Sequence, residues 1–280
     1  MRARLRFGLP LLPEGFELGP KIAVRGLSKV FQPARGAVIE ALRGIDLEIL
    51  DGEFITLIGA SGCGKTTLLR IMGGFEQAST GYIEIASRAG PSDLVTSTVF
   101  QEESVFPWLS VAGNVEYGLR IRGMAKDRRR QIVQHFIDKV GLSAFKDAYP
   151  SQLSGGMRQR VSVARAFANG PEVLLMDEPF GALDEQTRII LQQEVLRLWS
   201  EHRCTVVFVT HSLDEAITLS DRIIVLSARP GQVRADIRVD IPRPRPVSTL
   251  RAHPEYAGLY QRLWSLIEAD IERSRPAVIQ

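Results

Sequence analysis

Gly59-Ala60-Ser61-Gly62-Cys63-Gly64-Lys65-Thr66-Thr67 is the most informative motif in this 280-residue chain. It matches the pattern G-x-x-x-x-G-K-T in full. The preceding residues, 54–58, are rich in β-forming side chains and about as long as a buried strand, and residues 68–72 indicate a helix. A strand, a glycine-rich loop and a helix in this order predict a loop that binds the phosphates of a nucleoside triphosphate. A glycine-rich turn that merely joins strand to helix is the alternative.

The residue types of this loop suit phosphate chemistry. Glycine has no Cβ, so backbone N–H groups can turn toward an anion, and the positive end of the following helix adds to their effect. Lys65 is expected to reach the β- and γ-phosphates, and the Thr66 hydroxyl is expected to ligate Mg²⁺. The nucleotide-binding residues expected here are Gly59, Ser61, Gly62, Cys63, Gly64, Lys65, Thr66 and Thr67. Because Cys63 lies inside the loop, we also expect thiol alkylation to inhibit the protein.

The composition is that of a globular protein, with 45% hydrophobic residues, 24% charged residues and a net charge of +3. No run approaches the roughly eighteen apolar residues of a membrane span, so a membrane role would come through a partner. Prolines and glutamates interrupt the N-terminal apolar run, which predicts a loosely ordered leader over residues 1–20 rather than a cleaved signal. Cys63 and Cys204 form no disulfide framework, which favours a reducing cytosol. Residues 128–130, all arginine, are interpreted as a solvated helix face, so no nucleic-acid partner is expected.

The segments on either side of the loop differ in character. Short β-like runs over residues 21–49 predict a small antiparallel sheet. Phe31 lies in one of them, where an aromatic ring could stack on a base, although a core position is the commoner role. Residues 95–100 indicate a strand that ends at Gln101, which on its own is only a polar strand end. From about 102 to 167 the pattern becomes helical, and the expected helices span 111–121, 128–140 and 155–168.

Three further places carry chemistry. Ser154, Gly155 and Gly156 open a helix and could bind phosphate, although a plain N-cap explains them equally well. Asp177 and Glu178 follow a buried strand, which puts both carboxylates at the carboxyl edge of a parallel sheet. There Asp177 is expected to hold Mg²⁺ and Glu178 to polarise the attacking water, with a solvated acidic strand end as the alternative. The strand 205–210 ends at His211, which is placed to contact the γ-phosphate, although a lone histidine is more often structural.

The C-terminal region contains fewer signals. Residues 185–202 predict a long helix and residues 223–226 a further strand. Residues 241–246, where proline alternates with arginine, indicate a stiff extended linker. Residues 256–271 indicate a terminal helix.

The order of these motifs resembles the nucleotide-binding subunit of an ABC transporter over roughly residues 21–230. The resemblance implies an α/β fold, a P-loop ABC ATPase core with an antiparallel β subdomain and a helical subdomain. It implies a nucleotide-binding domain over residues 21–240, with the helical subdomain at about 102–167, and a C-terminal linker and helix over 241–280. It also implies ATP and Mg²⁺ as cofactors and ATP hydrolysis as the activity.

The resemblance also implies residue roles. Phe31 looks like the ring that stacks on adenine, and Gln101 like the glutamine that senses Mg²⁺ and the attacking water. Ser154, Gly155 and Gly156 look like the signature that contacts the γ-phosphate held by a second cassette, although Met157 stands where the family commonly has glutamine. Asp184 resembles the loop that crosses the dimer interface, and His211 the residue that clamps the γ-phosphate. The implied catalytic residues are Glu178, His211 and Gln101, and the implied metal ligands are Thr66, Gln101 and Asp177.

The implied partners follow from the same family. Residues 106–111, 153–160 and 227–231 look like the nitrate, sulfonate and taurine importers. A homodimer of cassettes, transmembrane permease subunits and, indirectly, a periplasmic or extracellular solute-binding protein are then expected, with the chain peripheral on the cytoplasmic face of the inner membrane. Trp108 is either a core residue or part of an apolar cluster that docks the permease. A soluble ABC ATPase or a P-loop kinase remains the alternative, and the transported solute is chosen by other subunits.

Overall fold

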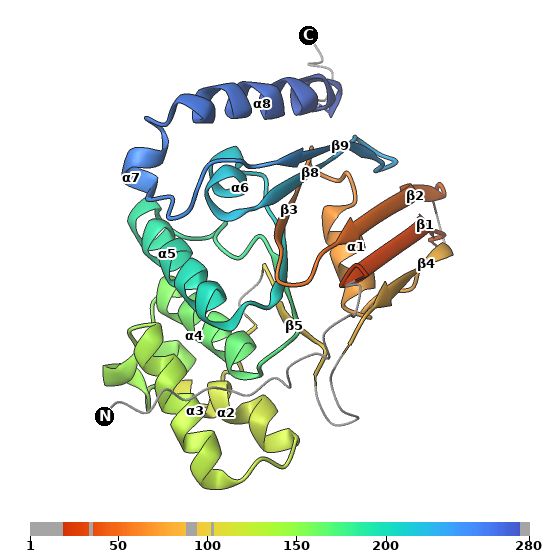
Figure 1. Ribbon diagram of the computed structural model, residues 1–280. Helices are drawn as coiled ribbons and strands as arrows, with labels where there is room; N and C mark the ends of the chain where they lie inside the picture. Colours follow the sequence, from red (N-terminus) through yellow and green to blue (C-terminus); the bar gives the residue numbers. More distant parts are fainter. Residues whose placement is uncertain (1–18, 34–35, 88–93, 102–103, 275–280) are drawn as a thin grey trace.

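The computed structural model describes residues 19–33, 36–87, 94–101 and 104–274, and two β-sheets dominate it (Figure 1). The expected leader lies outside the described residues except for its last two. Helix α1 (Lys65–Met72) lies between the sheets and shares one apolar cluster with both. Helix α1, which follows the phosphate loop, is therefore covered by one sheet on each of two sides.

The smaller sheet is antiparallel, as expected. It consists of β1 (Ile22–Phe31), β2 (Ile39–Ile49) and β4 (Thr80–Ile85) in the order β2-β1-β4. The short β-like runs over residues 21–49 belong to two long strands. Shifts in register interrupt the alternation of apolar and polar residues along each strand, so each strand looks like several short runs in the sequence. Gly26 and Gly44 lie near these shifts with φ of +52° and +54°, where a side chain would be strained.

The larger sheet positions the candidate site. Its strands are β3 (Phe54–Ile58), β5 (Thr96–Val99), β6 (Val173–Asp177), β7 (Thr205–Val209), β8 (Arg222–Leu226) and β9 (Val233–Arg238), in the order β5-β6-β7-β3-β8-β9. The first five are parallel, and β9 pairs antiparallel with β8. Every residue of β3, β6 and β7 is buried, which explains their unbroken apolar runs. The carboxyl ends of β5, β6, β7 and β3 consequently meet at one edge.

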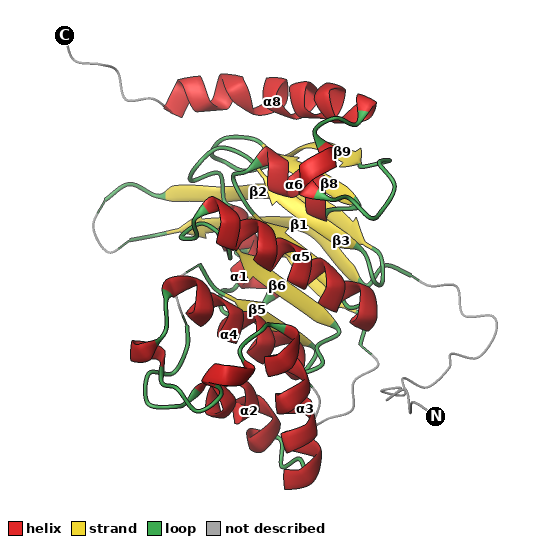
Figure 2. Ribbon diagram, turned by 90° about the vertical axis from the view of Figure 1, so that its left-hand side faces the viewer, coloured by secondary structure: helices red, strands yellow, loops and turns green. Residues whose placement is uncertain are grey.

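The structure confirms four predicted helices, with small differences only at the ends of α3: α2 (Val111–Ile121), α3 (Lys126–Lys139), α4 (Gly155–Ala168) and α5 (Glu185–His202). The sequence did not predict helix α6 (Leu213–Leu219) or two short 3₁₀ turns, η1 (Ser143–Phe145) and η2 (Pro150–Gln152). Helices α2, α3 and α4 gather beyond β5 at one end of the molecule in both views (Figures 1 and 2). They share one apolar cluster with α5 and with β6 and β7. The expected helical insertion is thus a group of helices packed on the α/β core.

The C-terminal segment returns to the core. After α7 (Val247–Leu250), helix α8 (Pro254–Ser274) lies along α6, β8 and β9 and buries Leu263 and Ile267 there. The expectation of a stiff linker at 241–246 is wrong for Ile241 and Arg245, because both are buried. The Arg245 guanidinium donates to four backbone carbonyls of the segments it packs against, and burial lowers its pKa to about 10. The sequence indicates only a stiff extended linker there, because the folded core alone supplies those carbonyls.

Candidate functional site

The phosphate loop joins the carboxyl end of β3 to α1. Gly59, Gly62 and Gly64 have φ of +152°, +74° and +101°. A Cβ on Gly59 would lie 2.5 Å from the carbonyl oxygen of Leu226. The glycines are therefore required by both backbone conformation and space. The buried Lys65 ammonium donates to the carbonyls of Gly59 and Ala60, at 2.9 and 3.1 Å, so the loop wraps around its own cation.

Cys63 faces inward from this loop. Its side chain is completely buried, and its backbone N–H donates to the carbonyl of Ala60 at 3.2 Å. Burial raises the pKa of the thiol, and the nearby Lys65 charge opposes that rise only in part. The thiolate is the form that reacts with alkylating agents. The expectation that Cys63 is readily alkylated is therefore corrected, because the thiol is both inaccessible and protonated.

Thr66 and Asp177 are brought together from α1 and β6. The Thr66 hydroxyl donates to Asp177 Oδ1 at 2.9 Å. Burial raises the pKa of Asp177, while the bond from Thr66 lowers it. A hydroxyl and a carboxylate are the oxygen ligands that Mg²⁺ takes in nucleotide sites, so this pair fits the metal expected from the sequence.

Three candidate catalytic side chains converge at the same sheet edge. Gln101 follows β5, Glu178 follows β6 and His211 follows β7 after one residue. Glu178 Oε2 lies 3.4 Å from Gln101 Nε2 and 3.1 Å from His211 Nδ1. Because β5, β6 and β7 are adjacent and parallel, their ends bring together residues separated by up to 110 positions.

The backbone at Glu178 is strained. Its φ is +43°, a left-handed conformation that is uncommon for a residue with a side chain. The strand β7 holds it there, because the Glu178 N–H donates to the carbonyl of Val209 at 2.9 Å, and its carbonyl accepts from the N–H of Gly181 at 3.1 Å. Such outliers concentrate at functional sites. Nothing in the sequence predicts this one.

The signature residues lie at a separate place. Ser154 caps α4 by accepting from the Met157 N–H at 3.3 Å, and Asp184 caps α5 by accepting from the Thr187 N–H at 3.0 Å. A Cβ on Gly156 would lie 2.6 Å from the Thr187 methyl group, so the two helix starts touch. Among the described residues, the hydrogen bonds of Ser154 and Asp184 connect to these helix starts and not to the phosphate loop. Among the described residues, neither side chain hydrogen-bonds to Gln101, Glu178 or His211.

Phe31 ends β1 and is not a core residue. Its ring is partly exposed, and the Lys29 ammonium lies 4.7 Å from the ring centroid. An accessible ring beside a cation is compatible with stacking on a base. The core alternative does not describe this position.

A buried carboxylate behind His211 was not anticipated. Glu215 Oε2 accepts from the Thr210 hydroxyl at 2.6 Å, and its Oε1 accepts from Gln192 on α5 at 3.3 Å. Burial raises the pKa of Glu215, and the bond from Thr210 opposes this. Glu215 thereby connects Thr210, the residue before His211, to Gln192 of α5. The available signal is the pair of acidic residues, Asp214 and Glu215, within the segment 213–219.

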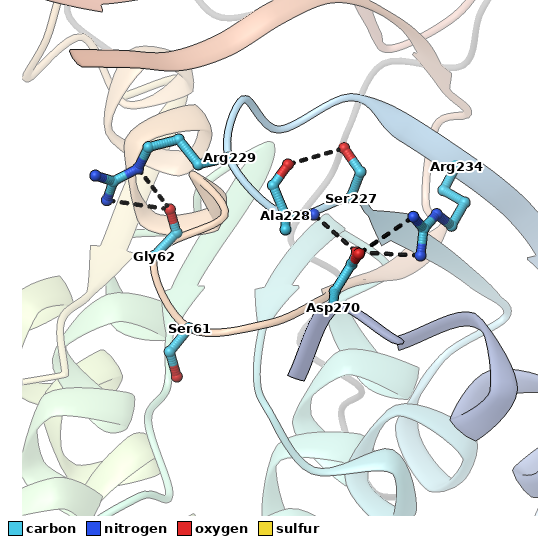
Figure 3. A pocket seen from close by; sticks show the side chains of 7 residues that line it. All are labelled: Ser61, Gly62, Ser227, Ala228, Arg229, Arg234 and Asp270. Carbon is cyan, nitrogen blue, oxygen red and sulfur yellow. Dashed lines mark hydrogen bonds and ion pairs between the residues drawn. The ribbon is translucent and has the colours of Figure 1, made fainter. Parts of the chain in front are cut away.

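The phosphate loop is also supported from the C-terminal helix (Figure 3). Asp270 on α8 accepts from the Ala228 N–H at 2.8 Å and pairs with Arg234 at 3.0 Å. The segment that follows Ala228 reaches the loop, because Arg229 donates to the Gly62 carbonyl at 3.4 Å. Together these residues line a cavity of about 460 Å³ with Ser61 and Ser227. No pattern in the sequence indicates this support.

The apolar cluster after Gln101 forms a rigid exposed loop. Asn114 of α2 is completely buried and donates to the carbonyls of Phe106, Leu109 and Ser110 at 3.0–3.1 Å. The Phe106 ring packs beside Trp108 at 5.5 Å between centroids. Trp108 itself is 68% exposed, so the core alternative is wrong for it.

A parallel sheet with a phosphate loop, a paired hydroxyl and carboxylate, and a polar triad at its carboxyl edge define a P-loop nucleotide-binding domain. The family model described as ABC transporter matches residues 42–181. The nitrate import ATP-binding protein NrtD of Synechocystis is 41% identical over 79% of this chain and 83% of its own length. The bicarbonate transport ATP-binding protein CmpC of Synechococcus elongatus is 45% identical over 85% of this chain but only 36% of its own length.

Among solved structures, the ATP-binding cassette MJ0796, in a dimeric post-hydrolysis state bound to ADP and phosphate, aligns with a TM-score of 0.69. It is 31% identical, and the alignment covers 79% of this chain and 99% of that one. The chain belongs to the ABC transporter family and is an ATP-binding ATPase of that family. In the described part of the chain, no helix has the length and hydropathy needed to cross a membrane.

Proposed function

We propose that this chain is the ATP-hydrolysing subunit of an importer for nitrate, sulfonate, taurine or a similar small solute. The family supports the ATPase, and the nitrate and bicarbonate named for NrtD and CmpC support a small oxyanion. The convergence of Gln101, Glu178 and His211 beside the phosphate loop is the observation that supports ATP hydrolysis at this site.

In the proposed mechanism, Glu178 Oε2 accepts the proton of the attacking water. Gln101 and His211, both within 3.4 Å of that oxygen, orient the water and contact the γ-phosphate respectively. Lys65 moves from the loop carbonyls to the β- and γ-phosphates, where its charge offsets theirs. Mg²⁺, held by Thr66 and Asp177 with Gln101 nearby, would neutralise charge on the phosphates.

We further propose that two copies of the chain form the working unit. The dimeric neighbour supports this, and so does the separation of Ser154, Gly155 and Gly156 from the phosphate loop. In a dimer, this signature would contact the γ-phosphate held by the other copy, with Asp184 at the interface and Phe31 stacked on adenine. A nucleotide-binding domain over residues 21–240 with a C-terminal segment over 241–280 is part of the same proposal.

The permease partner is proposed to dock at the loop around Trp108. A large aromatic side chain that is 68% exposed on a loop held by Asn114 is a suitable binding anchor. The loop begins five residues after Gln101 in the sequence. A movement of the loop on permease binding would therefore be transmitted to Gln101 and its neighbours Glu178 and His211. The chain would then be peripheral on the cytoplasmic face of the membrane, with a solute-binding protein acting indirectly.

The test uses the chain purified with its permease in lipid, for the parent and for Trp108→Ala. We expect permease-stimulated ATP hydrolysis to fall at least about tenfold in the variant, the effect of losing an aromatic anchor, while basal hydrolysis stays within about twofold. Trp264→Ala, which removes an exposed tryptophan on α8, is the matched control and should leave stimulation unchanged. Equal stimulation of the parent and Trp108→Ala would contradict the docking proposal, and hydrolysis indifferent to any permease would favour a soluble ABC ATPase.

A further inference from the structure

Two histidines and a glutamate meet where α3 approaches the end of α5, away from the catalytic edge. His135 lies on α3, and Glu201 and His202 are the last two residues of α5. One possible ligand atom of each lies within 4.8 Å of the others. A point can therefore be chosen no more than about 2.8 Å from all three, so side-chain shifts of under about 1 Å would reach the 2.0–2.2 Å of zinc ligands.

One of the two imidazoles has a ring nitrogen that no protein group satisfies. His202 Nε2 is buried and has no hydrogen-bond partner among the described residues. A buried polar atom without a partner normally calls for an explanation.

We propose that His135, Glu201 and His202 form a binding site for a transition-metal dication of the zinc type. Two imidazoles and one carboxylate suit Zn²⁺, with water completing a tetrahedron. The set does not suit Mg²⁺ or Ca²⁺, which prefer oxygen ligands throughout. The metal would join the helical region to the core helix α5, because its ligands come from both.

The charged neighbours set the strength of the site. Lys139 Nζ pairs with Glu201 Oε1 at 2.5 Å, so it competes with a metal for that carboxylate. Arg197 approaches from α5 and donates to the carbonyl of Lys139 at 2.6 Å, while Asp138 on α3 adds a negative charge that also acts on His135. Removing the Lys139 charge should therefore strengthen metal binding. Histidines that lie close together without forming a metal site would not show this effect.

The test measures Zn²⁺ affinity by competition with a chromophoric chelator, and Co²⁺ binding by its visible absorption, on the full chain in excess Mg²⁺. We expect one Zn²⁺ per chain, a four-coordinate Co²⁺ spectrum, and a melting temperature raised by roughly 5 °C at a hundredfold excess of Zn²⁺ over Kd. His135→Gln should weaken binding at least about tenfold, because even the loss of a group that only supports a ligand costs about 10–100-fold. Lys139→Gln should tighten it.

His253→Gln supplies the matched control, because it removes a histidine at the start of α8, outside the cluster. It should leave affinity and spectrum unchanged. His202 packs against Phe136 and Phe167, so His202→Gln could perturb folding, whereas the partly exposed His135 should not. Parent-like Zn²⁺ affinity in a folded His135→Gln protein, or the same loss in His253→Gln, would overturn the proposal.

Discussion

Asp270→Asn is expected to weaken ATP binding although Asp270 lies on the C-terminal helix. The carboxylate is 1% exposed and accepts from the Ala228 N–H and from Arg234. An asparagine of the same shape has only one acceptor oxygen, so in either orientation its NH₂ group faces a donor. A hydrogen bond to a charged group contributes about 1.5–3 kcal/mol. The ion pair with the partly exposed Arg234 adds at most about 1 kcal/mol.

The expected loss of stability is therefore about 2–3 kcal/mol, which lowers the melting temperature by roughly 3–5 °C for a chain of this length. If about 1.2 kcal/mol of this acts on the segment that contacts the phosphate loop at Gly62, the Kd for ATP rises about sevenfold. Calorimetric melting and titration with a fluorescent ATP analogue measure the two quantities. Glu268→Gln, which removes an exposed charge from the same helix, should change neither. An unchanged Kd in a folded Asp270→Asn protein would refute the coupling of α8 to the loop.

Three further predictions concern the site. Gly156→Ala should lower stability by about 1–2 kcal/mol, because its Cβ meets the Thr187 methyl at 2.6 Å. Thr187→Ser removes that methyl and should restore most of the lost stability in the double variant. A double variant that melts no higher than Gly156→Ala would contradict the contact. Cys63 should react with iodoacetamide at least about a hundredfold more slowly in the folded chain than in urea, and comparable rates would show that the loop opens freely. Asp177→Asn should abolish Mg²⁺-dependent hydrolysis. It should also raise the melting temperature at pH 7. Burial raises the pKa of Asp177, so the native state takes up a proton before the unfolded chain does, and the parent becomes more stable as pH falls. The difference in melting temperature between Asp177→Asn and the parent should therefore shrink in acid. A difference that grows in acid would contradict the burial argument.

Local sequence signals predicted the parts of the fold that depend on neighbouring residues. The phosphate loop, the buried strands β6 and β7 and the helices α2, α4 and α5 follow from continuous or periodic apolar patterns and caps such as Ser154 and Asp184. Gln101, Glu178 and His211 were placed at strand ends, and parallel pairing brings such ends to one edge. Their assignment to one family came from the order of the motifs rather than from any single motif.

The features that were missed depend on distant contacts. Strand β9 alternates apolar and charged residues, but its place is fixed by antiparallel pairing with β8. Arg245 is buried because four backbone carbonyls converge on it, whereas the sequence around it indicates a stiff extended linker. The left-handed backbone of Glu178 is held by Val209 of a neighbouring strand. The alternation in β9 indicates a strand but not its partner, and the other two features have no local signature, because each arises only when segments far apart in the sequence meet.

Glu178 is proposed to activate the water that attacks ATP. A comparison of ATP hydrolysis and ATP binding for the parent and Glu178→Gln tests this, because the change keeps the shape of the side chain and removes the proton acceptor. We predict that hydrolysis falls at least about a hundredfold, as expected for loss of a general base, while the Kd for ATP stays within about threefold and a nucleotide-bound dimer accumulates. Hydrolysis by Glu178→Gln at the parent rate would contradict it.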